Sequence, residues 1–193
     1  MALFKAYNPK VEVNGETVLS VVKGMGSMKA MGMKILDGNS IKDPKPGQWY
    51  PQQAWLDAFK YIAEKIGDST LKSIGKAIPE NAQWPPSVNS VESALASIDV
   101  AYHLNHRLLG KPLFDMKTGK MSEGIGHYAF EKTSSKSAKV TCDNPYPDAF
   151  DQGIIESAGK KFAKDGEMVI VKVDEKAGTR TQGKEKTIFV VTW

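Results

Sequence analysis

The apolar residues of this chain change their spacing near its middle, from a mainly helical period to an alternating one. Near the start, residues 10–13 alternate like a short strand, and Asn14 can cap a short helix over residues 16–23. Pro51 suits the first turn of a longer helix. Apolar side chains then recur at helical spacing at Trp55, Leu56, Phe59, Ile62, Ala63 and Ile66. Gly67 should end this helix.

Two further helices are expected in the first half. One follows Gly67 and should stop at Pro79, because proline lacks the N–H that an interior helical position donates. The other covers residues 89–108, where Asn89 and Glu92 resemble a capping box. Its apolar stripe comprises Val91, Leu95, Ile98 and Tyr102.

The second half alternates apolar and polar residues over short segments. Strands are expected at residues 125–131, 138–142, 168–173 and 187–193, with one helix over residues 148–163 between the second and third strands. Two hairpins joined through one helix are typical of an antiparallel sheet with helices on one face. The sequence therefore predicts an α+β fold, in which a helical N-terminal half packs on a four-stranded antiparallel sheet.

The length of 193 residues fits a single domain, with residues 1–110 as the mainly helical half and residues 111–193 as the sheet half. Cys142 is the only cysteine, which excludes an intramolecular disulfide and suits a reducing compartment. Residues 1–7 lack the apolar core and cleavage site of a signal peptide. No stretch reaches the roughly 18 apolar residues of a membrane span. We therefore expect a cytoplasmic protein.

The net charge of the chain is modest, at +4, and its lysines are interspersed with acidic residues. A nucleic-acid-binding protein usually carries a basic stripe with aromatic side chains on which bases stack. The sequence shows no such stripe, so we expect no nucleic acid among the partners, which should be a small hydrophobic molecule and a second copy of the chain.

Candidate chemistry concentrates on the helix over residues 89–108. At about 100° per residue, Asp99, His103 and His106 fall on one side of this helix, beside its apolar stripe. Neutral imidazoles three residues apart can share a metal ion, with a carboxylate one turn away. His127, in the first strand of the sheet, could supply a further ligand. The alternative is that these histidines sit at the edge of the core and are held by hydrogen bonds.

Cys142 lies at the end of a strand and just before a helix, in the loop Cys142–Asp148 with its two prolines. The N–H groups and dipole of a helix N-terminus lower the pKa of a nearby thiol. Cys142 is therefore a candidate redox, metal-binding or ligand-contacting thiol. The alternative is a small buried residue beneath a capped turn.

Four segments of the second half carry a distinctive set of aromatic, glycine and proline residues: Gly126–Phe130, Val140–Tyr146, Phe150–Ile155 and Phe189–Trp193. Together they resemble the superfamily that contains 4-vinyl reductase-type domains and haem-nitric-oxide-binding domains. The resemblance covers the last part of the chain well and the helical half in outline.

The resemblance implies a small-molecule-binding or sensor domain, often a homodimer, with its ligand pocket between the helical half and the sheet. The haem sensors of the superfamily carry a Tyr-x-Ser-x-Arg motif, and no such string occurs here. As a cofactor, haem is therefore less favoured than a metal ion, although His103 or His106 could serve as an axial ligand.

The leading interpretation is a sensor-like domain that encloses a small, largely apolar molecule. We expect ligand contacts from Trp55, Trp84, Tyr102, Cys142 and Tyr146, because ligand pockets are mostly apolar with a few placed polar groups. The first alternative is a metal-dependent enzyme that uses His103 and His106 with His127 or Cys142. The second alternative is a haem-binding gas sensor. A scaffold without any site is a further rival. The sequence reveals no reaction, so whether the chain is an enzyme stays open.

Overall fold

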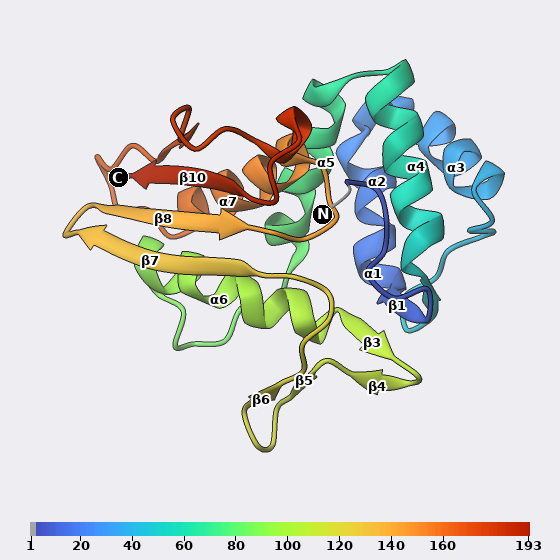
Figure 1. Ribbon diagram of the computed structural model, residues 1–193, viewed down its shortest axis with the longest axis horizontal. Helices are drawn as coiled ribbons and strands as arrows, with labels where there is room; N and C mark the ends of the chain where they lie inside the picture. The colour runs from blue at the N-terminus through green and yellow to red at the C-terminus, as the bar shows by residue number, and fades with distance from the viewer. Residues whose placement is uncertain (1–2) are drawn as a thin grey trace.

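The computed structural model places the first helices of the chain on one side of the molecule and the antiparallel sheet of the C-terminal half on the other (Figure 1). The structure describes residues 3–193. The expectation that residues 1–7 are not a signal peptide includes residues 1–2, which lie outside the described residues. The α+β fold predicted from the sequence is confirmed.

The N-terminal half forms the helices predicted after Asn14, Pro51 and Gly67, together with a helix over residues 29–38, which was not predicted. They are α1 (Gly15–Val18), α2 (Ser20–Gly24), α3 (Lys29–Gly38), α4 (Gln52–Lys65) and α5 (Asp68–Asn81), with a 3-10 turn at Gly26–Met28. As expected, the side chain of Asn14 caps α1 by accepting the N–H of Thr17 at 2.9 Å.

The prediction that Pro79 ends its helix is wrong, because α5 continues to Asn81. Pro79 has no N–H, so the helix lacks one backbone hydrogen bond at this position. Only two residues follow the proline in the helix. The buried Pro79 also accepts a hydrogen bond, from the Trp84 indole to its carbonyl oxygen at 3.0 Å. This bond turns the chain directly after the helix.

The long helix α6 (Val91–Leu104) is shorter at both ends than the predicted 89–108. Ser90 and Ser93 form its capping box, in place of Asn89 and Glu92. The chain leaves the helix at Asn105, and His106 starts strand β3 (His106–Leu108), opposite Val13. His106 therefore lies on a strand, because its backbone is committed to that pairing.

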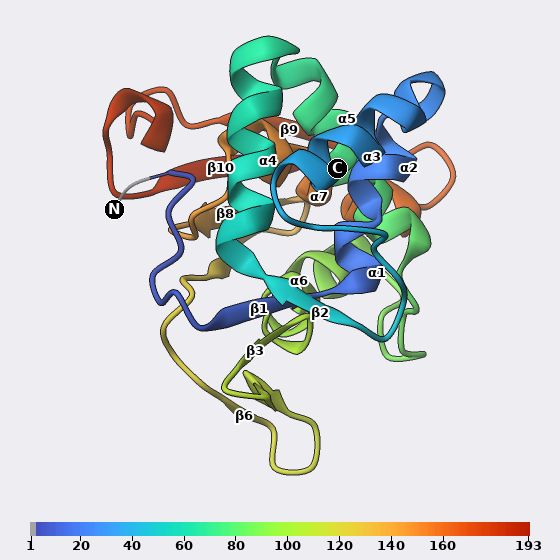
Figure 2. The same ribbon diagram turned by 90° about the vertical axis from the view of Figure 1, so that its right-hand side faces the viewer.

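A small second sheet was not expected, apart from its strand β1 (Val11–Asn14). Its order is β2-β1-β3-β4, with β2 (Trp49–Pro51) and β4 (Lys111–Pro112) at the edges. Strands β5 (Phe114–Asp115) and β6 (Lys120–Met121) form a separate hairpin. Both views show this hairpin projecting from the body of the molecule (Figures 1 and 2).

The main sheet confirms the predicted four-stranded antiparallel arrangement. Its order is β7-β8-β10-β9, and it comprises β7 (Tyr128–Ser134), β8 (Ser137–Cys142), β9 (Ile170–Val173) and β10 (Thr187–Thr192). The first strand begins at Tyr128 rather than at residue 125. Gly124 and Gly126 have φ angles of 118° and 77°, which a strand cannot contain.

Strand β10 lies inside this sheet, between β8 and β9. Trp193 therefore does not follow an edge strand, because β7 and β9 form the edges of this sheet. The homodimer stays a prediction, and light scattering at micromolar concentration would test it.

Helix α7 (Asp148–Lys161) connects the two hairpins and packs against α5, α6 and β9. A 3-10 turn at Arg180–Gln182 precedes β10. The crossing of α5 and α7 is close because two glycines meet backbone there. A Cβ atom on Gly75 would lie 2.1 Å from the Phe150 carbonyl oxygen, and one on Gly153 would lie 2.2 Å from that of Lys72. Among the described residues, no helix combines the length and apolarity needed to cross a membrane.

Candidate functional site

A cavity of about 180 Å³ lies where the N-terminal helices meet α6 and α7. Most of its lining is apolar or aromatic, and it comes from α1, α4, α5, α6, α7 and the connection after α5. Four of the five residues predicted to contact a ligand line the cavity: Trp55, Trp84, Tyr102 and Tyr146. Cys142 does not line it. The resemblance implied a pocket between the helical half and the sheet, whereas this cavity lies mainly between helices, with Tyr128 as its one lining residue from the main sheet among the described residues.

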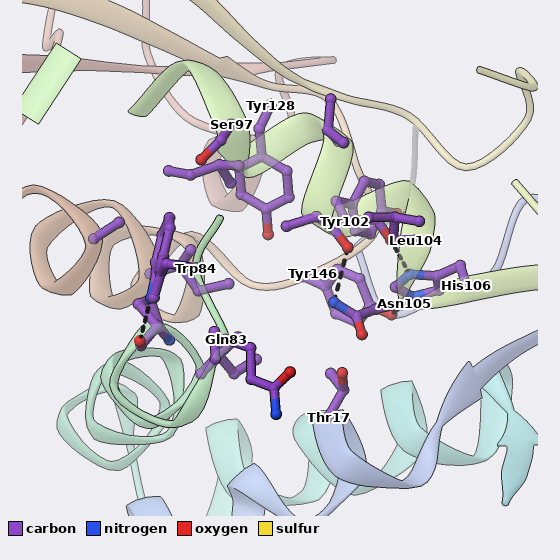
Figure 3. A pocket seen from close by; sticks show the side chains of 18 of the residues that line it. Thr17, Gln83, Trp84, Ser97, Tyr102, Leu104, Asn105, His106, Tyr128 and Tyr146 are labelled. Carbon is purple, nitrogen blue, oxygen red and sulfur yellow. Dashed lines mark hydrogen bonds between the residues drawn. The ribbon is translucent and has the colours of Figure 1, made fainter. Parts of the chain in front are cut away.

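The aromatic wall of the cavity is packed before any ligand arrives. The Trp55 ring meets Tyr146 edge-on, with 5.2 Å between ring centroids, and Tyr146 lies 5.5 Å from Phe150. Such pairs contribute about 0.5–1.5 kcal/mol each beyond the area that they bury. Figure 3 shows Thr17 and Gln83 approaching the cavity from one side, and Tyr102 and Tyr146 from the other. The pocket is thus largely preformed.

A chain of hydrogen bonds runs through the core beside the cavity. Gln52 donates to the Tyr146 hydroxyl at 3.0 Å, and that hydroxyl lies 2.7 Å from Nε2 of His106. Nδ1 of His106 lies 2.7 Å from the carbonyl oxygen of Tyr102. Since a carbonyl can only accept, Nδ1 carries the proton and Nε2 accepts from Tyr146.

Burial lowers the pKa of His106 to about 4, because removing the imidazolium from water is unfavourable. The ring is therefore neutral at neutral pH. His106 brings a polar group to the cavity without bringing a charge, which suits an uncharged ligand better than an anion.

Two buried polar atoms in or near these hydrogen-bonded residues have no hydrogen-bond partner among residues 3–193. They are Nε1 of Trp55 and Oε1 of Gln52. A buried donor or acceptor that is unpaired costs roughly 1–3 kcal/mol. Trp55 lines the cavity, and its indole N–H is a buried donor without a partner among the described residues.

A second group of polar side chains lies between α6 and the start of β7, outside the cavity lining. Asp99, His103 and His127 each bring one potential ligand atom to within 4.8 Å of the others. The sequence placed Asp99 and His103 together correctly. His106, which was expected in the same group, is absent from it because it lies on β3, where its ring contacts Tyr102 and Tyr146 instead.

Of the two interpretations of Cys142, its surroundings favour the buried residue over the reactive thiol. The residue is fully buried, and burial raises the pKa of the thiol well above its ordinary value, with the charge of Asp151 adding to the rise. Desolvation outweighs the helix N-terminus that follows. The alternative, a small buried residue beneath a capped turn, describes Cys142 better.

Sequence reasoning missed a buried charged network beneath the sheet. Arg180 donates to Asp148 at 2.7 Å and to Asp151 at 2.6 Å, while the Tyr128 hydroxyl donates to Asp151 at 2.5 Å. The signal was present, because Asp151 interrupts the apolar face of its helix directly after Phe150. A buried carboxylate at such a position requires a paired cation.

Comparisons with known proteins place this architecture. No protein-family model matches the sequence, and no curated protein matches it. Solved structures do match over nearly the whole chain. An H-NOX protein from S. oneidensis in the Fe(II)NO ligation state has a TM-score of 0.61 at 12% identity, covering 92% of this chain and 97% of its own. The chain has the fold of H-NOX domains.

Two further H-NOX structures agree. An oxygen-binding H-NOX domain related to soluble guanylate cyclases has a TM-score of 0.58 at 16% identity, with 92% of each chain covered. The Fe(II) unliganded H-NOX protein from K. algicida has a TM-score of 0.59 at 10% identity, covering 93% of this chain and 95% of its own. The haem-nitric-oxide-binding part of the resemblance is confirmed at the level of fold. The 4-vinyl reductase part stays untested.

The likeness to these solved structures shows the fold, and their descriptions make haem the cofactor to test against the side chains of this chain. The side chains allow a separate test of haem. A cavity of about 150 Å³ holds one benzene-sized molecule, and the cavity here has about 180 Å³, whereas haem is a macrocycle of four pyrrole rings. The cavity therefore has room for a single small molecule.

The donor set gives the same answer. His106 is the one histidine among the described residues that lines the cavity, and both its ring nitrogens already make hydrogen bonds. Among the described residues, no lysine or arginine lines the cavity to pair with the two haem propionates. The cavity residues as folded do not fit haem, although the fold is that of haem proteins.

Proposed function

We propose that this chain is a small-molecule-binding, sensor-like domain that takes its ligand into the cavity between the N-terminal helices, α6 and α7. The observation that carries the proposal is the cavity itself. It is lined by aromatic side chains and bordered by an internal chain of hydrogen bonds. The likeness to H-NOX domains supports a sensor, because those proteins include one described as oxygen-binding.

The cavity defines the class of ligand. Its size suits an uncharged molecule of about one ring. Its apolar lining would supply most of the affinity through burial, while the indole N–H of Trp55 could donate one hydrogen bond. The neutral state of His106 disfavours an anionic ligand at this position.

A sensor must also convert binding into a change of shape. The cavity is bounded by α1, α4 and α5 on one side and by α6 and α7 on the other. A ligand that fills it contacts both groups of helices. Occupancy would therefore stabilise one relative position of the two groups, and this is the kind of differential contact that a population shift requires.

A haem-binding gas sensor is the second candidate function, and the likeness to H-NOX domains in the Fe(II)NO and unliganded Fe(II) states is what favours it. It would require the side chains around the cavity to rearrange substantially. In that case His103, whose Nε2 is buried and unpaired within the described residues, would be the candidate axial ligand.

One pair of titrations separates the two functions. Purified chain is titrated with toluene and phenol while its melting temperature is followed, and separately with hemin while absorbance in the Soret region is followed. The cavity proposal predicts a saturable rise in melting temperature with the small probes and no stoichiometric Soret band. A Soret band that saturates at one hemin per chain would support the haem sensor instead.

A matched pair of variants locates the binding. Ala158 is fully buried on α7 and lines the cavity, so Ala158→Met should fill the space and abolish the rise with toluene. Ala163 is half-buried just beyond α7 and does not line the cavity, so Ala163→Met should leave that rise unchanged. Equal loss in both variants would remove the cavity as the site.

A further inference from the structure

Helix α6 presents different chemistry on two faces. Its cavity face includes Ile98, Tyr102 and Asn105. Asp99 and His103 lie about 100° further round the helix from Ile98 and Tyr102, on the side that packs against β7. His127, which directly precedes β7, meets them there, with 5.1 Å between its ring centroid and that of His103.

His103 is held as a metal-binding histidine usually is. Its Nδ1 lies 2.8 Å from the carbonyl oxygen of Asp99, so Nδ1 donates and the lone pair is left on Nε2. A backbone carbonyl that orients the ring in this way is common behind metal-binding histidines. Nε2 is fully buried and has no hydrogen-bond partner among residues 3–193.

The other two groups are held close by. Oδ2 of Asp99 lies 3.0 Å from Nδ1 of His127, and Oδ1 of Asp99 accepts the backbone N–H of Tyr128 at 3.0 Å. Nε2 of His127 lies 2.8 Å from Glu123, whose side chain is 81% exposed. Glu123 therefore offers a carboxylate at the solvent side, and the 27% exposed His127 gives an ion a route in.

We propose that Asp99, His103 and His127 bind one divalent transition-metal ion of the Zn²⁺ type, separate from the cavity. Two imidazoles and one carboxylate form a donor set that Zn²⁺ and its neighbours prefer, with a water molecule or Glu123 in the fourth position. Mg²⁺ prefers oxygen ligands and should not compete. The ion would tie α6 to the start of β7, so it would stabilise the wall that the cavity shares.

The test is a calorimetric titration of chelator-treated, tag-free chain with ZnCl₂, with MgCl₂ as the control ion. The proposal predicts one Zn²⁺ per chain, no Mg²⁺ binding, and a melting temperature that rises with Zn²⁺. His127→Gln and Asp99→Asn should each weaken Zn²⁺ binding at least tenfold and remove the rise. Glu131→Gln, an exposed carboxylate on β7 outside the cluster, should leave both unchanged.

Contrary results are equally specific. Zn²⁺ binding that is absent, exceeds one per chain without a distinct tight site, or survives His127→Gln at full strength would overturn the proposal. Because His103 is fully buried, loss of folding in His103→Asn would not separate a structural role from a metal-binding one, so the partly exposed His127 decides the test. The outcome is independent of the toluene titration, which probes the cavity.

Discussion

Nε2 of His106 lies 2.7 Å from the hydroxyl oxygen of Tyr146, in the buried core beside the cavity. The two residues are 40 positions apart, on the strand after α6 and in the loop before α7. Their hydrogen bond joins the strand that follows α6 to the loop that leads into α7, and both residues line the cavity.

Removal of the Tyr146 hydroxyl should destabilise the fold. Tyr146→Phe leaves Nε2 of His106 and the amide of Gln52 without their shared partner, which should lower the free energy of unfolding by about 1–3 kcal/mol. Tyr61→Phe is the matched control, because Tyr61 is 47% exposed and should change stability by less than about 0.5 kcal/mol. Urea unfolding measures both. Equal effects would mean that the buried hydrogen bonds contribute nothing.

His106 should make stability fall in mild acid. Burial lowers its pKa from 6.5 to about 4, so between these pH values the unfolded chain binds a proton that the folded chain does not. The free energy of unfolding should therefore decrease as pH falls from 6.5 to 4, by up to about 3 kcal/mol from this group. His106→Gln should flatten that part of the pH profile. Parallel profiles for the two proteins would show that His106 titrates normally in the folded state.

Glu156 should act in more acidic solution. Burial alone would raise its pKa, but hydrogen bonds from Lys160, Lys72 and Lys76 outweigh burial and lower the pKa from 4.5 to about 2. Its contribution is therefore complete above pH 4.5 and is lost as pH falls towards 2. Because the three lysine side chains are partly exposed, we expect only about 1 kcal/mol.

The comparison is between wild type and Glu156→Gln at each pH, with the exposed Glu64→Gln as control. The difference in unfolding free energy should be present at neutral pH and shrink towards zero near pH 2. A difference that stays constant with pH would mean that the variant acts by some route other than charge.

The crossing of α5 and α7 should not tolerate a side chain. A methyl group in Gly153→Ala would lie 2.2 Å from the Lys72 carbonyl oxygen, so the helices must separate. We expect a loss of about 3 kcal/mol or more, or failure to fold. Gly38→Ala is the control, because no atom lies within 4 Å of its added Cβ. Thermal unfolding of the two variants checks this, and a stable Gly153→Ala protein would contradict the packing.

Much of the fold could be predicted from the local spacing of apolar residues. The apolar period after Pro51 predicted α4, the alternating segments predicted the strands of the main sheet, and Asn14 was correctly identified as a helix cap. Each of these features depends on residues within a few positions of one another, which is the range over which a pattern in one sequence is informative.

Features that depend on distant residues could not be predicted. Because His106 pairs with Val13, α6 ends before His106 and this residue lies on a strand. The residues next to His106 in the sequence do not indicate that partner. The two interpretations of Cys142 could not be separated from the sequence, because its burial depends on packing across the sheet. The proximity of Asp99 and His103 could be predicted from helical spacing. The hydrogen bond between His106 and Tyr146 could not, because Tyr146 lies 40 residues away in the sequence.

The central claim is that the cavity beside Trp55 and Tyr146 receives a small, uncharged molecule. A crystal structure of the chain exposed to toluene vapour tests it most directly. The account predicts density for one toluene molecule inside the cavity, in van der Waals contact with these two rings and with the helices otherwise in place. A cavity filled by its own side chains, or toluene bound only elsewhere on the molecule, would contradict it.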